Sequence, residues 1–315
     1  MCKTIIDNYN SKKHTRGFIT IATGHEKYFH LALNLLRSYR ACAINPLPFA
    51  ILTDKENEYT KEFDDVFLLG SLATGSYMDK LYLAEYVPYD ETIFVDADSL
   101  CLSDPNEVFE DFQECGDVSF YGWITPLDSP SGWFNYAKCH EYKDKIQYHI
   151  GGHGGLCYFR RTEKCKEIMS LARKISGEYD KYDFSYFSKP ADEPVIALAM
   201  AVTGCIPCQK PKKMIFWPRY RGRLKIDYRG TIKIDRKEAQ IVFLHFGTPY
   251  TSRFFYKWLQ ELIENNYYVE NPSIGKKRYL KLRIRMLPNS IKKGFTHQCF
   301  LFLRKVNPKF IKNKD

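Results

Sequence analysis

Short apolar runs bounded by turn residues alternate with amphipathic segments along most of the chain. Such runs predict strands over residues 17–24, 47–54, 65–70, 91–98, 117–123, 154–161 and 239–247. Apolar residues at helical spacing predict helices over residues 28–40, 78–87, 162–177 and 192–204. This alternation is typical of an α/β fold, in which helices cover both faces of a mostly parallel sheet.

The segment ETIFVDADSL (91–100) places two aspartates directly after a buried strand. Burying the like charges of Asp96 and Asp98 is costly, so a positive partner such as a metal ion or a lysine is expected nearby. A turn or helix N-cap is the plainer alternative, because SLCLSDPNEVF follows. The i,i+2 spacing favours a metal site over a turn.

Three separate segments reach the carboxyl ends of predicted strands, where α/β sheets bind their ligands. They are the IATG turn (21–24), the Asp96–Asp98 pair, and His245 after the run IVFL. Two carboxylates and one imidazole predict a divalent-metal site, with Mn²⁺ favoured over Mg²⁺ by the nitrogen ligand. Taken alone, His245 is equally well explained as a packed or solvated residue.

The string Asp96-Ala97-Asp98 followed by SLCLSDPNEVF resembles the DxD region of GT-A glycosyltransferases. It is most similar to family 8, the glycogenin-like and lipopolysaccharide-galactosyltransferase-like enzymes, and the order of elements matches over about residues 17–260. The resemblance implies a GT-A fold and transfer of a hexose-type sugar from a UDP-sugar to a glycan or lipid-linked acceptor. It also implies a retaining mechanism, Mn²⁺ or Mg²⁺ as cofactor, and a role in envelope polysaccharide synthesis.

The resemblance implies donor contacts for residues of the first strand end and the DxD region. Ala22 and Thr23 match the nucleotide-binding turn, and Lys80 matches a basic position before the DxD strand. Asp96, Ala97 and Asp98 form the DxD itself.

Two later motifs of the family are also similar. GGHGGLCYFRR resembles the Asn-Ala-Gly motif, with His153 in place of the Asn and Gly154 as the glycine. FLHFGTPY resembles the late His-plus-Gly motif, which makes His245 the third metal ligand and places Gly247 at the diphosphate. Tyr250 occupies a place near that of the usual Lys, so Arg253 is the candidate for the phosphate contact.

Asp192 and Glu193 open the helix predicted over 192–204 and match the family's acidic motif, with Glu where Gln is usual. An acidic group would stabilise the oxocarbenium-like sugar, so both are candidate catalytic residues. The alternative is that Asp-Glu-Pro simply caps the helix.

Charge divides the chain unevenly. The net charge is +10, and residues 271–315 hold 13 Lys or Arg and one acid. We therefore expect a catalytic domain over residues 1–270 and a basic amphipathic tail over residues 271–315. The tail suits an anionic membrane surface, although a helix packed on the body is the alternative.

No apolar run reaches the length of a membrane span, and the N-terminus lacks a signal-peptide pattern. The expected location is the cytoplasm, peripherally on the inner face of a membrane. No nucleic-acid-binding module is recognisable, so no nucleic-acid partner is expected. The ten cysteines show no paired framework; Cys205 and Cys208 form a CxxC that favours structural thiols over a metal or redox site.

Two other classes of function stay open. A haloacid-dehalogenase-like phosphatase also uses a strand-end DxD, but there the motif follows the first strand. A membrane-associated scaffold that keeps the GT-A fold without activity is the non-catalytic alternative. The aromatic and basic segments 129–142 and 210–225 are either acceptor contacts or solvated loops.

Overall fold

We describe the protein from a computed structural model. The structure describes residues 15–129, 132–184, 190–216, 224–226, 232–234, 240–264 and 280–286. The chain divides into two compact units, the first Met1–Arg221 with Asp235–Gly247 and the second Gly222–Ile234 with Thr248–Asp315.

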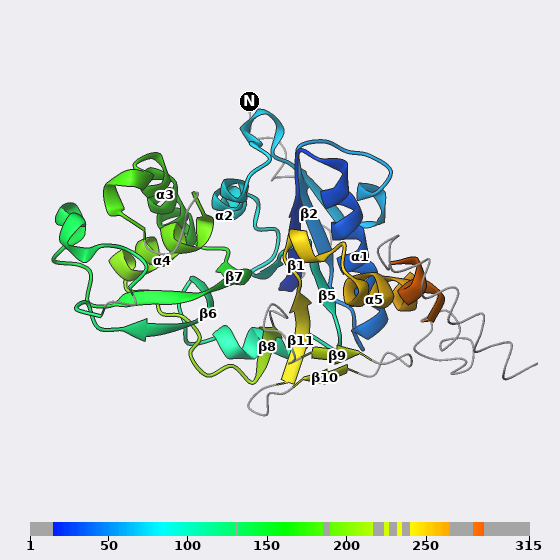
Figure 1. Ribbon diagram of the computed structural model, residues 1–315. Helices are drawn as coiled ribbons and strands as arrows, with labels where there is room; N and C mark the ends of the chain where they lie inside the picture. Colours follow the sequence, from blue (N-terminus) through cyan, green and yellow to red (C-terminus); the bar gives the residue numbers. More distant parts are fainter. Residues whose placement is uncertain are drawn as a thin grey trace, which may run out of the picture. The chain divides into compact units, whose positions relative to one another are not determined.

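Eleven strands and five α-helices are described, with short 3₁₀ segments between them (Figure 1). The strands are β1 (Arg16–Ala22), β2 (Phe49–Thr53), β3 (Asp65–Leu68), β4 (Glu91–Val95), β5 (Ser99–Cys101), β6 (Val118–Thr125), β7 (His149–Arg160), β8 (Lys213–Phe216), β9 (Leu224–Ile226), β10 (Ile232–Ile234) and β11 (Gln240–His245). The helices are α1 (Glu26–Cys42), α2 (Leu83–Tyr86), α3 (Glu163–Gly177), α4 (Asp192–Thr203) and α5 (Phe254–Glu264).

A six-stranded sheet with the order β3-β2-β1-β4-β7-β6 forms the centre of the first unit. The strands β3, β2, β1 and β4 pair in parallel, and β7 runs antiparallel to both of its neighbours. This confirms the predicted α/β class with a mostly parallel sheet. The carboxyl ends of β1, β2 and β4 therefore meet at one rim of the sheet.

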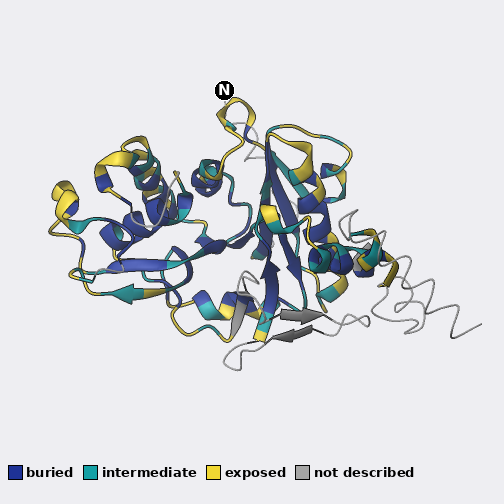
Figure 2. Cartoon of the chain, viewed as in Figure 1, coloured by how far each residue is buried: buried dark blue, intermediate teal, exposed yellow. Residues whose placement is uncertain are grey.

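Both faces of this sheet are covered, as alternating side chains on β1 demonstrate. The ring of Phe18 lies 5.0 Å from that of Tyr39 in α1 and 5.4 Å from that of Phe109. The next residue, Ile19, belongs to a buried cluster that contains Leu198 of α4. Burial on both faces explains the near-continuous apolar sequences of β1, β2 and β4, most of whose residues are buried and coloured dark blue in Figure 2.

A smaller sheet of the first unit, with the order β5-β11-β8, determines where the late part of the chain lies. Strand β11 pairs antiparallel with β5, and the register sets His245 opposite Ser99. This pairing brings the end of β11 to the turn that follows β4.

Two predicted elements differ in the structure. Residues 78–87 were expected to form one helix, but a 3₁₀ segment, Tyr77–Tyr82, precedes the single α-turn of α2. Strand β7 begins at His149, five residues earlier than expected, and includes both glycine pairs of GGHGG. The local packing favours glycine there, because a Cβ on Gly151 would lie 2.7 Å from the indole of Trp123 and one on Gly152 would clash with the ring of Phe120.

The second unit contains the antiparallel pair β9–β10, helix α5 and a helical turn over residues 280–285. In that turn Leu282 is buried, and Arg285 pairs with Glu261 of α5 at 3.2 Å. This segment therefore contacts α5, while the rest of the predicted tail lies outside the described residues, and the membrane role of residues 271–315 stays a prediction. No helix in the described part of the chain is long and apolar enough to cross a membrane.

Cys205 and Cys208 are both buried. The backbone N–H of Cys208 donates to the carbonyl oxygen of Phe120 at 2.9 Å, which attaches this segment to the edge of β6. No cluster of three metal-ligand side chains includes either cysteine within the described residues. The structural interpretation of the CxxC remains a prediction.

Candidate metal centre

Asp96 and Asp98 lie in a tight turn between β4 and β5. The N–H of Ser99 donates to the carbonyl oxygen of Asp96 at 3.0 Å and closes the turn. The N–H of Asp96 donates to the carbonyl oxygen of Gly155 at 2.9 Å, which attaches the turn to β7. The turn alternative and the cluster prediction are thus compatible, because the backbone forms the turn while the carboxylates face the end of β11.

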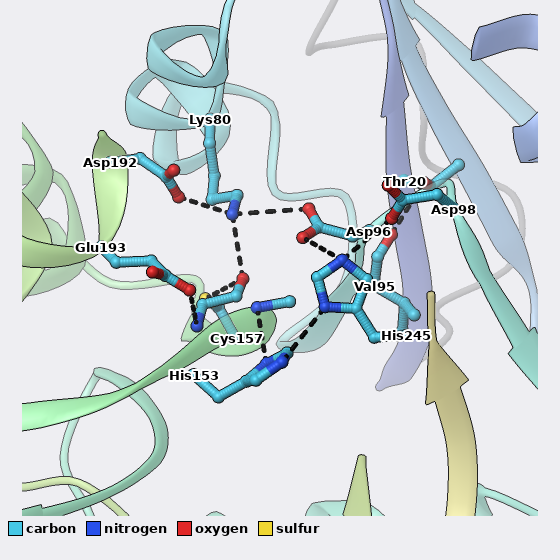
Figure 3. Close-up of polar contacts among 12 residues, drawn as sticks. Thr20, Lys80, Val95, Asp96, Asp98, His153, Cys157, Asp192, Glu193 and His245 are labelled. Atoms are coloured by element: carbon cyan, nitrogen blue, oxygen red, sulfur yellow. Dashed lines mark hydrogen bonds and ion pairs between the residues drawn. The ribbon is translucent and has the colours of Figure 1, made fainter. Parts of the chain in front are cut away.

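His245 lies beside both carboxylates, as Figure 3 shows. Its Nε2 is 2.9 Å from Oδ1 of Asp98 and 3.4 Å from Oδ2 of Asp96. One ligand atom from each of the three residues lies within 4.8 Å of the others. Of the three segments expected at this rim, the Asp96–Asp98 turn and the end of β11 bring their side chains together in this cluster.

The donor set fits a divalent cation. Carboxylate oxygens suit Mn²⁺ and Mg²⁺, and a single imidazole nitrogen favours Mn²⁺. Burial disfavours the charged form of His245, but the hydrogen bond and charge of Asp98 outweigh it and raise the pKa of the imidazole. Burial raises the pKa of Asp96, against the opposing charges of Lys80 and His245. A divalent cation would supply positive charge to two half-buried carboxylates that lie close together.

Lys80 connects the cluster of Asp96, Asp98 and His245 to helix α4. Its ammonium lies 2.5 Å from Oδ2 of Asp192 and 3.5 Å from Oδ1 of Asp96, and it donates to the carbonyl oxygen of Gly154 at 2.9 Å. The side chain is buried over the ring of Phe94. Burial opposes the charge, but Asp192 and Asp96 outweigh it, so the pKa of Lys80 lies well above its usual value.

The two acids at the start of α4 point into the site. Asp192 pairs with Lys80, and Oε1 of Glu193 accepts a hydrogen bond from the N–H of Gly154 at 2.8 Å. Burial, followed by the charge of Asp192, raises the pKa of Glu193 to about 7. The N-cap residue of α4, Ala191, makes no side-chain capping bond. Both acids lie in the first turn, which is favourable for the helix dipole, yet their side chains contact Lys80 and Gly154.

His153 contacts His245 directly. Nε2 of His153 lies 3.1 Å from Nδ1 of His245, and Nδ1 of His153 accepts from the N–H of Gly155 at 3.1 Å. Burial, followed by the charge of His245, lowers the pKa of His153 to about 3, so the ring is neutral at ordinary pH. Since Nδ1 of His153 accepts and the ring is neutral, its Nε2–H donates to Nδ1 of His245, and this bond fixes the orientation of the His245 ring.

Thr23 lies at the rim next to β1, held by a residue that the sequence analysis missed. Its hydroxyl donates to Oδ2 of Asp79 at 2.6 Å, and the N–H groups of Thr74 and Gly75 donate to the same carboxylate. Asp79 is fully buried. Its position directly before Lys80 was the only hint of this role in the sequence. The Asp79 carboxylate holds the predicted nucleotide-binding turn next to residues 74–75.

The remaining predicted donor residues are distributed as follows. Ala22 is the buried last residue of β1, and Ala97 is buried between the two aspartates. Gly247 adopts the left-handed conformation, with φ of 70°. Arg253 belongs to the second unit, where its guanidinium lies 4.2 Å from the centre of the Tyr250 ring. A phosphate contact of Arg253 stays a prediction.

No protein family and no curated protein matches the sequence. Among solved structures, the chain is similar to the apo-form glycosyltransferase GlyE of Streptococcus pneumoniae TIGR4, with 10% sequence identity and a TM-score of 0.47. The similarity covers 85% of this chain, which spans 63% of the length of that structure.

Proposed function

We propose that this protein is a metal-dependent GT-A glycosyltransferase, most like family 8, that transfers a hexose-type sugar from a UDP-sugar with retention. The observation that carries the proposal is the convergence of Asp96, Asp98 and His245 at the carboxyl end of β4, beside the buried Lys80. The carboxyl ends of parallel strands are where such sheets bind nucleotides.

Asp96, Asp98 and His245 would hold Mn²⁺ or Mg²⁺. When bound, the cation supplies positive charge to the diphosphate leaving group of the donor. Lys80 holds the carboxylate of Asp96 in place through its 3.5 Å contact and adds a second positive charge close to the diphosphate. Gly247 and Arg253 are the proposed further phosphate contacts.

The turn Ala22–Thr23 is the proposed contact for the nucleoside. Asp79 fixes this turn before the donor arrives, because its carboxylate accepts hydrogen bonds from both Thr23 and the 74–75 segment. A binding turn that is already ordered loses little conformational entropy when the ligand binds.

Asp192 and Glu193 are the proposed groups next to the sugar. Positive charge develops on the sugar ring as its bond to the diphosphate breaks, and a nearby carboxylate stabilises it. Asp192 is held by Lys80, while Glu193 and His153 flank Gly154. The acceptor would be a glycan or glycolipid in envelope polysaccharide synthesis. The basic residues of 271–315 would hold the enzyme on the cytoplasmic face of an anionic membrane.

Thermal-shift measurements with UDP and Mn²⁺, separately and together, test the proposal. We expect a larger stabilisation with both than with either alone, and Asp96→Asn or Asp98→Asn should abolish the additional shift. Asp90→Asn is the matched control, since Asp90 pairs with Arg161 at the surface. Equal shifts in the wild type and both site variants would contradict the donor site.

A screen of nucleotide sugars for Mn²⁺-dependent hydrolysis then identifies the donor. Hydrolysis of p-nitrophenyl phosphate without any nucleotide-sugar activity would instead support the phosphatase alternative. A chain that binds neither UDP nor Mn²⁺ would support the scaffold alternative.

A further inference from the structure

Strands β6 and β7 continue past the rim of the sheet as a two-stranded ribbon. The last residue pair between β4 and β7 is Val95 with Leu156, whereas β6 and β7 remain paired as far as Thr125 with His149. The ribbon therefore extends from the metal centre, and it carries His153 at its base and Trp123 farther out. Two residue steps separate these positions along the strand, which corresponds to about 7 Å.

The two faces of the ribbon have different surroundings. A Cβ on Gly154 would contact Glu193, whereas a Cβ on Gly155 would contact the rings of His153 and His245. The residue pairs Tyr121–His153 and Trp123–Gly151 place residues 151 and 153 on one face of the ribbon, and His153 contacts His245 from that face. Trp123 is paired with Gly151 and lies on this same face, since its indole occupies the space above that glycine.

Trp123 is fixed in place and yet exposed. Its indole lies over Gly151 and makes an edge contact with Trp133, with 6.0 Å between ring centroids and an interplanar angle of 81°. Trp133 is buried, but 47% of Trp123 remains exposed. An exposed indole held in one orientation is typical of an interaction site, because leaving that apolar area in water is unfavourable.

The chemistry of this face favours a neutral ring compound. The described residues of the ribbon's outer part on this face, Trp123, Thr125, His149 and Gly151, carry no permanent charge, and burial lowers the pKa of His149. The C–H face of a sugar ring packs on an aromatic ring in the same way as other apolar surfaces do. Nucleic acid would require Lys or Arg for its phosphates, and within the ribbon only Arg160, at the opposite end of β7, is basic.

We propose that Trp123 is an acceptor-binding residue: a sugar of the acceptor glycan stacks on its indole while the acceptor end reaches the metal centre. This inference rests on the proposed function, because it takes the donor sugar to lie beside His153 and Gly154. The glycine at 151 is part of the subsite, since any side chain there would displace the indole.

The test measures binding of neutral tetrasaccharides, such as maltotetraose, cellotetraose and chitotetraose, to the full chain by calorimetry. We expect at least one to bind the wild type, and Trp123→Ala to raise its Kd roughly tenfold. Trp123→Phe should recover most of the affinity, because it restores an aromatic face. Gly151→Val should weaken binding as Trp123→Ala does. Ile44→Ala is the control, because Ile44 is 77% exposed on the segment after α1. This variant should bind the tetrasaccharide as tightly as the wild type does.

Three outcomes would overturn the inference: no tetrasaccharide binds the wild type, Trp123→Ala binds as tightly as Ile44→Ala, or Trp123→Ala converts a dimer into a monomer without any glycan binding. The last outcome would identify the indole as an interface with a second copy. The thermal shift with UDP and Mn²⁺ reports the donor site separately. A chain that binds a tetrasaccharide through Trp123 but gives no such shift would contradict the proposed function alone.

Discussion

The ammonium of Lys80 lies 2.5 Å from a carboxylate oxygen of Asp192, and both side chains are buried. Lys80 lies before strand β4, and Asp192 is the first residue of α4. Their ion pair therefore joins the candidate metal centre to the helix that carries the candidate catalytic acids. The same ammonium reaches Asp96 at 3.5 Å.

Removing Lys80 should therefore destabilise the fold strongly. Lys80→Met leaves Asp192 buried without its partner, which typically costs about 3–5 kcal/mol in the free energy of unfolding. The double variant Lys80→Met, Asp192→Leu should recover much of that loss, because no uncompensated charge remains. Urea unfolding measures both effects. Lys166→Met, which breaks an exposed pair with Glu163, should change stability by less than about 1 kcal/mol. Equal losses in the free energy of unfolding for Lys80→Met and Lys166→Met would contradict the role of Lys80.

The raised pKa of Glu193 predicts a pH-dependent stability. Its pKa rises from 4.5 to about 7 in the folded chain, so the folded state binds this proton more tightly than the unfolded state does. The free energy of unfolding should fall by at most about 3 kcal/mol as the pH rises from about 4.5 to 7. Above pH 7 it should level off. Glu193→Gln removes this dependence while retaining an acceptor for Gly154. Its Tm should match the wild type at pH 5 and exceed it at pH 8. A constant difference across that range would rule out titration of Glu193.

Metal affinity should depend on both histidines, to different extents. His245→Ala removes a ligand, and His153→Ala removes the partner that orients it, a change that typically costs 10- to 100-fold in affinity. Calorimetric titration with Mn²⁺ should rank the affinities as wild type, then His153→Ala, then His245→Ala. His140→Ala, on an exposed 3₁₀ segment, serves as the control. Unchanged Mn²⁺ affinity in His153→Ala would show that the ring contact does not orient the ligand.

The basic end of the chain should determine membrane binding. A chain that ends at Met286 retains the packed residues 280–286 and loses seven basic residues. The full chain should co-sediment with anionic vesicles at low salt and dissociate as salt rises, because screening acts over about 10 Å at 0.1 M ionic strength. The shortened chain should not co-sediment. Equal sedimentation of both chains, or none by the full chain, would contradict the membrane role.

Seven strands (β1, β2, β3, β4, β6, β7 and β11) and the helices α1, α3 and α4 follow from local patterns, and so does the position of Asp96 and Asp98 at a strand end, whereas β5, β8, β9, β10 and α5 were not predicted. The position of His245 beside these residues depends on the register of β11 on β5, which sets His245 opposite Ser99. That register depends on contacts between distant segments, which periodicity does not report. The same is true of Asp79 and of the ring contact between His153 and His245. The predicted strand over 154–161 left out residues 149–153, because apolar periodicity gives no signal for Gly151 and Gly152, whose lack of a side chain leaves room for Trp123 and Phe120.

The pairing of β5 with β11 also has a consequence for synthesis on the ribosome. Strand β5 and the Asp96–Asp98 turn emerge early, but their partner strand emerges only after the β9–β10 segment of the second unit has been made. Contacts of such long sequence separation form slowly and late. A nascent chain that already contains the central sheet therefore has no complete metal centre. If the cluster holds a divalent cation as proposed, that affinity arises only when β11 docks, and cation binding would stabilise the finished chain and not its precursors.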